Sequence, residues 1–135
     1  MKWLKWFFAG ALAVPLAHQP MLALCAILGL TTRKPYPMTP TEPFGVPAVV
    51  SLSFWGGVWG VILALLLRRL IGPKYWIVAI LFGAIAPTLV AAFIVPPLKG
   101  LPIGGDMKMA LMGLLVNGAW GFGTALFARV LERKG

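Results

Sequence analysis

Four long apolar stretches dominate the sequence and cover approximately residues 6–30, 47–67, 75–95 and 107–130. Each stretch is close to or above the roughly 20 apolar residues that a helix needs to cross a bilayer. Inside lipid, the backbone polar groups must be satisfied within helices or a closed barrel. The stretches lack the alternation of inward and outward residues that barrel strands show, which favours helices. The pattern therefore predicts an all-α, polytopic membrane protein in which residues 1–135 form a single transmembrane domain, a four-transmembrane-helix bundle.

Composition agrees with this prediction and removes several classes of protein. Hydrophobic residues make up 60% of the 135 positions and charged residues 11%, with a mean hydropathy of +0.91. A soluble domain usually carries about a quarter charged residues. A soluble enzyme and a disordered tail are therefore excluded. A disulfide scaffold is excluded as well, because Cys25 is the one cysteine and has no internal partner.

Two segments at the ends of the first apolar stretch need separate interpretation. The start, MKWLKW followed by FFAGALAVPLA, imitates a signal peptide. The apolar character resumes at once in MLALCAILGL, so we expect a retained helix rather than a cleaved one. Residues 31–46 contain four prolines, at positions 35, 37, 40 and 43. Proline lacks an amide donor and biases its predecessor away from helix, so this segment is predicted to be an extended outer loop.

The basic residues are distributed unevenly across the predicted membrane. Of the 12 Lys and Arg residues, two precede the first span, three separate the second from the third and three lie at or beyond the end of the fourth, which places eight on the side of the termini and four on the other. The positive-inside rule then predicts that both termini are cytoplasmic. We attribute the net charge of +9 to this topology rather than to nucleic-acid binding. Small size, short loops and this asymmetry favour a bacterial inner (plasma) membrane.

Aromatic residues near the predicted boundaries resemble interfacial anchoring belts. They are Trp3, Trp6, Tyr75 and Trp76 on the inner side, with Tyr36 and Phe44 on the outer side.

The second and fourth spans align without a gap. Residues 57–60 (GVWG) match residues 118–121 (GAWG), and Arg68 matches Arg129, at a constant offset of 61. More loosely, GALA at 10–13 resembles GAIA at 83–86, at an offset of 73. These matches predict two tandem helical hairpins, a parallel internal repeat in which both halves have the same orientation.

Small residues recur on one face of the second span and of the fourth. Helices in lipid associate through close backbone approach at such faces. We therefore predict that the second and fourth spans make the tightest contacts of the bundle. The residues expected at this interface are Gly56, Gly57, Trp59, Gly60, Gly113, Gly118, Trp120 and Gly121.

Several polar side chains are predicted to share one depth near the middle of the membrane. They are His18 and Gln19 in the first span, Thr88 in the third and Asn117 in the fourth. His18 is the one ionisable residue expected inside the bilayer, which makes it a candidate functional residue. The alternatives are polar contacts that hold the helices together, a role with a solute or proton, and ligation of a cofactor. Polar contacts are the favoured interpretation.

A metal site is a weaker candidate. His18, Met21 and Cys25 follow one another at spacings of three and four, which places them on one stripe of the first helix. All three side chains bind Cu(I) or haem iron. Met and Cys are also ordinary apolar fillers of helix faces, so neither a metal nor a cofactor is expected.

These features favour a small integral membrane protein of structural or accessory type, either an assembly factor or a small subunit of a larger membrane complex. No catalytic residues are identified, so an enzyme is not expected. The alternative is a small-solute or ion transporter or channel with a polar site around His18. The size and four crossings are similar to those of the small multidrug resistance transporters, but the first span carries no acidic residue. Expected partners are the lipid bilayer, another membrane protein or a second copy of the chain.

Overall fold

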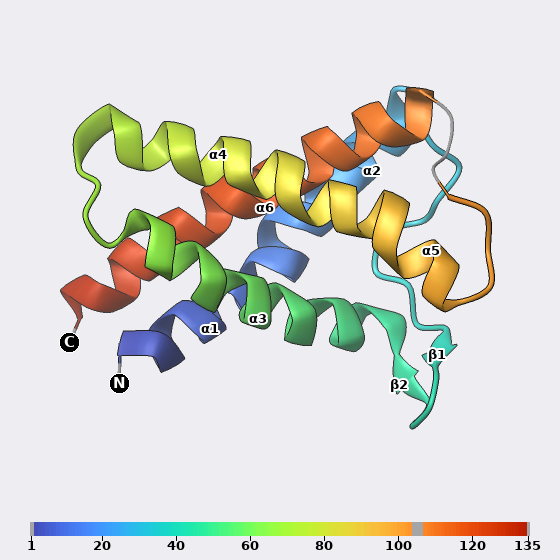
Figure 1. Cartoon of the computed structure of the whole chain (residues 1–135), viewed down its shortest axis with the longest axis horizontal. Coiled ribbons are helices and arrows are strands. Elements are labelled where there is room, and N and C mark those ends of the chain that lie inside the picture. The colour runs from blue at the N-terminus through green and yellow to red at the C-terminus, as the bar shows by residue number, and fades with distance from the viewer. Residues whose placement is uncertain (1, 104–106, 135) are drawn as a thin grey trace.

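The computed structural model describes residues 2–103 and 107–134, and its regular structure is helical apart from one very short strand pair (Figure 1). Four helical legs are each long and apolar enough to cross a membrane, as the sequence predicts. The legs are Lys2–Ile27, Ala48–Leu67, Gly72–Leu98 and Met107–Arg133. Both ends of the chain lie at the same end of the bundle (Figure 1).

The first and third legs are each built from α-helices joined by a π-helical turn. The first contains α1 (Lys2–Ala13), η1 (Val14–His18) and α2 (Gln19–Ile27), and the third contains α4 (Gly72–Leu89), η2 (Val90–Ile94) and α5 (Val95–Leu98). Pro15 lies within η1, and Pro87 lies in the last turn of α4 just before η2. Because proline cannot donate its backbone hydrogen bond, a widened turn accommodates the break in the ladder.

The second and fourth legs are the uninterrupted helices α3 (Ala48–Leu67) and α6 (Met107–Arg133). The third leg continues through Pro96 and Pro97 to Leu98, although the sequence analysis ends it at residue 95. Both prolines fall in the first turn of α5, directly after the π-helical turn η2, and neither can donate the backbone hydrogen bond that would continue the ladder.

The segment between the first leg and α3 contains the strand pair β1 (Pro40–Thr41) and β2 (Val46–Pro47), which are antiparallel with Thr41 opposite Val46. The Thr41 hydroxyl donates to the Val46 carbonyl oxygen at 2.7 Å. This short hairpin leads directly into α3.

The prediction that the second and fourth spans make the tightest contacts is wrong. Instead, α3 packs on α1 through Gly60 and Gly10, and α6 packs on α4 through Gly121 and Gly83. A methyl group built on Gly60 would lie 3.0 Å from Gly10 Cα, and one built on Gly121 would lie 3.1 Å from Gly83 Cα. Close backbone approach at glycine therefore does hold the bundle together, but it joins consecutive legs.

Most of the other residues predicted for a contact between the second and fourth spans also face different partners. Gly57 packs against the Phe7 ring of α1, Gly113 against Thr88 of α4 and Gly118 against Ala84 of α4. Gly56 faces Val14 and the backbone of Gly10, and it also meets the Trp120 ring of α6, so this one predicted contact between the second and fourth spans is present. The Trp59 ring meets the Phe82 ring of α4 with centroids 5.9 Å apart.

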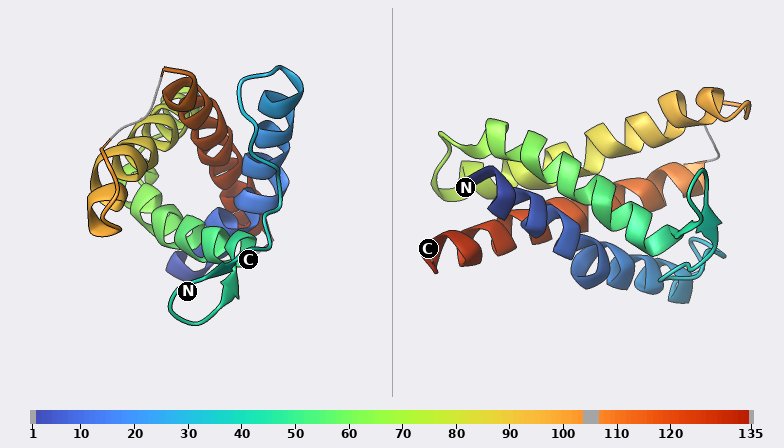
Figure 2. Two further views of the ribbon diagram at one scale, coloured as in Figure 1. Left: turned by 90° about the vertical axis from the view of Figure 1, so that its right-hand side faces the viewer. Right: turned by 90° about the horizontal axis from the view of Figure 1, so that it is seen from below.

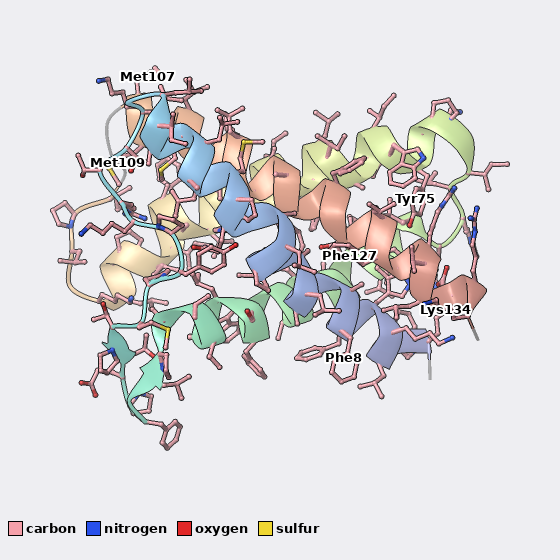
Figure 3. All side chains as sticks on the ribbon, turned by 180° about the vertical axis from the view of Figure 1, so that it is seen from behind. Phe8, Tyr75, Met107, Met109, Phe127 and Lys134 are labelled. Atoms are coloured by element: carbon pink, nitrogen blue, oxygen red, sulfur yellow. The ribbon has the colours of Figure 1, made fainter. Side chains whose placement is uncertain are left out.

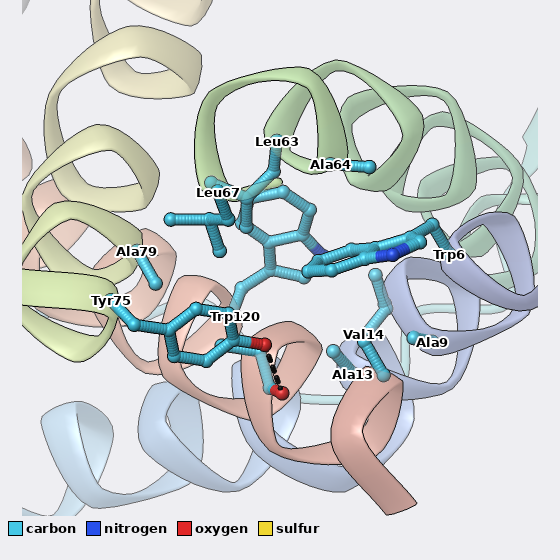
Figure 4. Close-up of a cluster of buried hydrophobic side chains, with 12 residues drawn as sticks. Trp6, Ala9, Ala13, Val14, Leu63, Ala64, Leu67, Tyr75, Ala79 and Trp120 are labelled. Carbon is cyan, nitrogen blue, oxygen red and sulfur yellow. Dashed lines mark hydrogen bonds between the residues drawn. The ribbon is translucent and has the colours of Figure 1, made fainter. Parts of the chain in front are cut away.

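The two halves of the bundle meet mainly where α6 crosses α1. In the end-on view α6 lies between the first leg and α4 (Figure 2). Trp120 is 3% exposed at this crossing, and its Nε1–H donates to the Gly10 carbonyl oxygen at 3.0 Å. The Trp120 side chain lies near Leu63 and Leu67 of α3, so one buried ring connects three helices (Figure 4).

Candidate functional site

The four polar side chains predicted for the middle of the membrane are joined by hydrogen bonds. The Gln19 amide Nε2 lies 2.9 Å from His18 Nδ1. His18 is also hydrogen-bonded to the Asn117 side chain of α6. The Asn117 amide Nδ2 then donates to the Thr88 hydroxyl of α4 at 2.9 Å. This polar network, defined as His18, Gln19, Asn117 and Thr88, links three legs of the bundle.

The network lies nearer to the end of the bundle that is opposite the termini. Asn117 is ten residues beyond the start of α6, and Thr88 is ten residues before the end of the third leg at Leu98. Ten residues correspond to about 15 Å of helix at about 1.5 Å per residue. That distance is half of a hydrocarbon core of about 30 Å.

Tyr36 of the proline-rich loop between the first leg and α3 connects to the same network. Its backbone amide donates to Gln19 Oε1 at 2.6 Å, and its hydroxyl donates to the Pro15 carbonyl oxygen at 2.7 Å. Gln19 is fully buried, and both polar atoms of its amide group are hydrogen-bonded, Nε2 with His18 and Oε1 with Tyr36. Tyr36 is predicted to belong to an outer aromatic belt, and its contact with Gln19 is not predicted, because it joins residues 17 positions apart through a folded loop.

Every buried polar side-chain atom of the network has a partner. Within residues 2–103 and 107–134, no buried side-chain nitrogen or oxygen lacks a hydrogen bond. An unpaired amide or hydroxyl in an apolar medium costs several kcal/mol, so this saturation matters for stability. The arrangement acts chemically as a set of cross-links between helices.

The residues considered for a metal site belong to two different surroundings. His18 is part of the polar network, whereas Cys25 is 1% exposed and packs with Leu22, Met112 and Val116. Met21 packs at the edge of this second cluster. Among the described residues, no group of three His, Cys, Asp or Glu side chains is arranged to hold a metal ion.

A second set of interactions lies at the end of the bundle that carries the termini. The Arg129 guanidinium lies over the rings of Tyr75 and Trp76, 4.2 and 5.2 Å from their centroids. The Tyr75 hydroxyl donates to the Ala125 carbonyl oxygen at 2.8 Å, a contact visible in Figure 4. The Trp6 Nε1–H donates to the Glu132 carboxylate at 3.1 Å.

This second set corrects part of the predicted aromatic belt. Trp6 is 2% exposed and Tyr75 5% exposed, so both rings face the interior of the bundle and not lipid. Trp3 is 47% exposed and Phe44 is 88% exposed, as a belt residue would be. Hydropathy separates aromatic from polar residues, but the side to which a ring turns depends on helix rotation.

An open apolar groove of about 600 Å³ runs beside the polar network, between the first leg and α4 with α6 as its floor. Its walls include Leu16, Met21 and Ile80, and its floor includes Gly118 and Phe122. None of the four network side chains lines this groove.

No protein family, no curated protein and no solved structure matches the chain.

Proposed function

We propose that this chain is a structural or accessory membrane protein, a small subunit or assembly factor of a larger membrane complex, and not an enzyme. The observation that carries the proposal is the saturation of the polar network. His18, the one histidine of the chain, is tied to Gln19 and Asn117. A solute would have to break these hydrogen bonds to reach it. Side chains that cross-link helices suit a scaffold better than a translocation site.

A second observation supports a protein partner. Of the four legs, Gly72–Leu98 has the smallest buried share. Its outer half exposes Leu89, Phe93 and Ile94. A transmembrane helix gains stability by packing on neighbours, and this leg has a free apolar face for another protein or for a second copy of the chain.

The proposed orientation has both termini in the cytoplasm, in a bacterial inner membrane. Lys2, Lys5, Arg68, Arg69, Lys74, Arg129, Arg133 and Lys134 lie at the terminal end of the bundle. The positive-inside rule assigns that end to the cytoplasm.

We further propose that the chain is a tandem repeat of two helical hairpins. At the offsets of 73 and 61, the contact of Gly60 with the Trp6 carbonyl oxygen corresponds to that of Gly121 with the Ala79 carbonyl oxygen. The contact of Gly10 with the Gly56 carbonyl oxygen corresponds in the same way to that of Gly83 with the Asn117 carbonyl oxygen. Equivalent positions thus make equivalent contacts in both hairpins.

The accessory role is tested by purification of the full chain in a gentle detergent, followed by identification of bound proteins. We expect one membrane protein in constant stoichiometry. A photo-crosslinking residue at Phe93, on the exposed leg, should reach that partner, whereas one at Leu12 of α1 should not. Recovery of the chain alone, as a single oligomer without any other protein, would overturn the proposal.

A transporter or channel is the second candidate, because η1 and η2 interrupt two legs beside the polar network. Broken helices are a feature of transporter sites. His18→Ala separates the two candidates. A scaffold predicts reduced stability of the bundle, whereas a transporter predicts a folded protein that no longer moves its solute.

A further inference from the structure

We propose that the face of α6 turned to the groove binds one anionic phospholipid, with an acyl chain in the apolar groove and the phosphate on Arg129 and Arg133. The inference goes beyond the accessory role and does not depend on it.

The groove has the form and chemistry that an acyl chain requires. It is open along one side and has a volume of about 600 Å³. Every lining residue is apolar or small, with Leu16 and Met21 on one wall, Ile80 and Ala84 on the other, and Gly118 and Phe122 on the floor. Small residues on the floor leave space that bulky side chains fill elsewhere on α6.

The groove leads along α6 to two arginines. Leu115, Gly118 and Phe122 line the groove, and Arg129 and Arg133 follow on the same stripe, at spacings of three, four, seven and four. Seven residues are almost two turns, or about 10 Å of helix. Along the axis of α6, Arg129 therefore lies about 21 Å from Leu115. The half-thickness of the hydrocarbon core is about 15 Å, and the rest of this distance falls within the headgroup region.

The Arg129 side chain is held in place for a phosphate. Its guanidinium lies over Tyr75 and Trp76, 4.2 and 5.2 Å from the ring centroids. The Trp76 ring in turn meets the Phe122 ring, with centroids 5.4 Å apart, so the aromatic platform is continuous with the groove floor. A planar guanidinium with fixed orientation binds phosphate oxygens in a bidentate manner.

The polar end of this face is a second open pocket of about 310 Å³, lined by Arg129, Glu132 and Arg133. The Glu132 carboxylate accepts a hydrogen bond from Trp6 Nε1–H at 3.1 Å. Two guanidinium groups against one carboxylate leave a net positive charge. The pocket is thus complementary to an anionic headgroup, while the groove selects a ligand that also has an acyl chain.

The chain offers a matched control for this site. Arg68 is the counterpart of Arg129 at the offset of 61 and lies at the same end of the bundle. Arg68 is exposed, and within the described part of the chain the cation–π contacts belong to Arg129. Loss of Arg68 removes the same charge from the same membrane surface without removing the proposed site.

The test is a lipid titration of the full chain in detergent, followed by native mass spectrometry. Dioleoyl phosphatidylglycerol should bind more tightly than dioleoyl phosphatidylcholine. Arg129→Gln should weaken phosphatidylglycerol binding by about tenfold or more, because a charge-assisted hydrogen bond is lost. Arg68→Gln should leave it unchanged. Ala119→Leu, which fills the groove from its floor, should weaken binding severalfold while the protein melts as the parent does in phosphatidylcholine.

Several results would overturn the proposal. Equal binding of the two lipids, or equal effects of Arg129→Gln and Arg68→Gln, would mean that surface charge alone attracts lipid. If Ala119→Leu bound phosphatidylglycerol as tightly as the parent does, the groove would be excluded as the site of the acyl chain. If inorganic phosphate displaced bound phosphatidylglycerol as strongly as added phosphatidylglycerol does, the site would bind phosphate and not a lipid. If Arg129→Gln does not fold, Arg133→Gln replaces it in the test, since Arg133 is exposed. If Arg133→Gln then bound phosphatidylglycerol as tightly as the parent does, the assignment of the phosphate to the two arginines would be rejected.

Discussion

Gly83 of α4 and Gly121 of α6 meet backbone to backbone, so closely that a methyl group on Gly121 would lie 3.1 Å from Gly83 Cα and would strike the Ala79 carbonyl oxygen. Gly10 and Gly60 make the same kind of contact between α1 and α3. Each hairpin is therefore held together by a pair of glycines that faces the next leg in sequence.

Gly121→Ala should destabilise the bundle by about 1–3 kcal/mol, because the added methyl group forces the α4 and α6 backbones apart. Gly118→Ala is the matched control in the same helix. Its methyl group would meet Ala84 Cβ at 3.5 Å, an ordinary van der Waals distance. Thermal melting in detergent measures both variants. Equal melting of Gly121→Ala and the parent would contradict the assigned contact.

Gln19→Leu should release the outer loop from the bundle. The substitution leaves the Tyr36 amide without its acceptor and removes one of the two hydrogen-bond partners of His18, at a cost of about 1–3 kcal/mol. Limited proteolysis between residues 31 and 38 should become faster, whereas Ser53→Ala, which removes a local contact within α3, should leave it unchanged. Identical cleavage rates for Gln19→Leu and the parent would argue against the anchoring role of Gln19.

Trp120→Phe should lower stability, since the Gly10 carbonyl oxygen loses its donor and a buried ring becomes smaller. The expected cost is about 1–3 kcal/mol. Trp55 is 57% exposed, so Trp55→Phe provides a comparison with the same chemical change on the surface. Chemical or thermal unfolding of both variants measures the difference. A larger loss for Trp55→Phe would place the critical tryptophan elsewhere.

Single cysteines test the proposed orientation. In a Cys25→Ala background, Met38→Cys in the outer loop should react with an impermeant maleimide on intact cells, and Lys134→Cys should react only after the cells are opened. Both native side chains are exposed, so burial does not limit the reaction. Labelling of Lys134→Cys alone on intact cells would reverse the orientation.

The members of the polar network illustrate what residue type and spacing predict. His18, Gln19, Thr88 and Asn117 are identifiable from the sequence because polar groups inside lipid are rare and need partners. Their depth follows from counting residues along each helix. The contacts of Tyr36 with Gln19 and Pro15 cannot be predicted by counting residues, because they depend on how the loop folds back onto the bundle.

Arg129 shows the opposite case. In the sequence it is one of several basic residues that mark the end of a span, and only the structure brings it onto Tyr75 and Trp76. The aromatic residues of α4 and the arginine of α6 are more than 50 positions apart, so no local pattern connects them.

The sequence by itself determined the number of spans, their approximate limits, the helical class and the candidates for polar contacts, because the cost of placing polar groups in lipid acts on each residue independently of its neighbours in space. The tertiary structure alone decided which legs pair. Gly60 of α3 and Gly121 of α6 each lie on a helix face of small residues. These two faces could pack against each other as well as against α1 and α4. A face of small residues predicts that a helix will pack closely on a neighbour. Which helix becomes that neighbour depends on the rotation and crossing of whole helices.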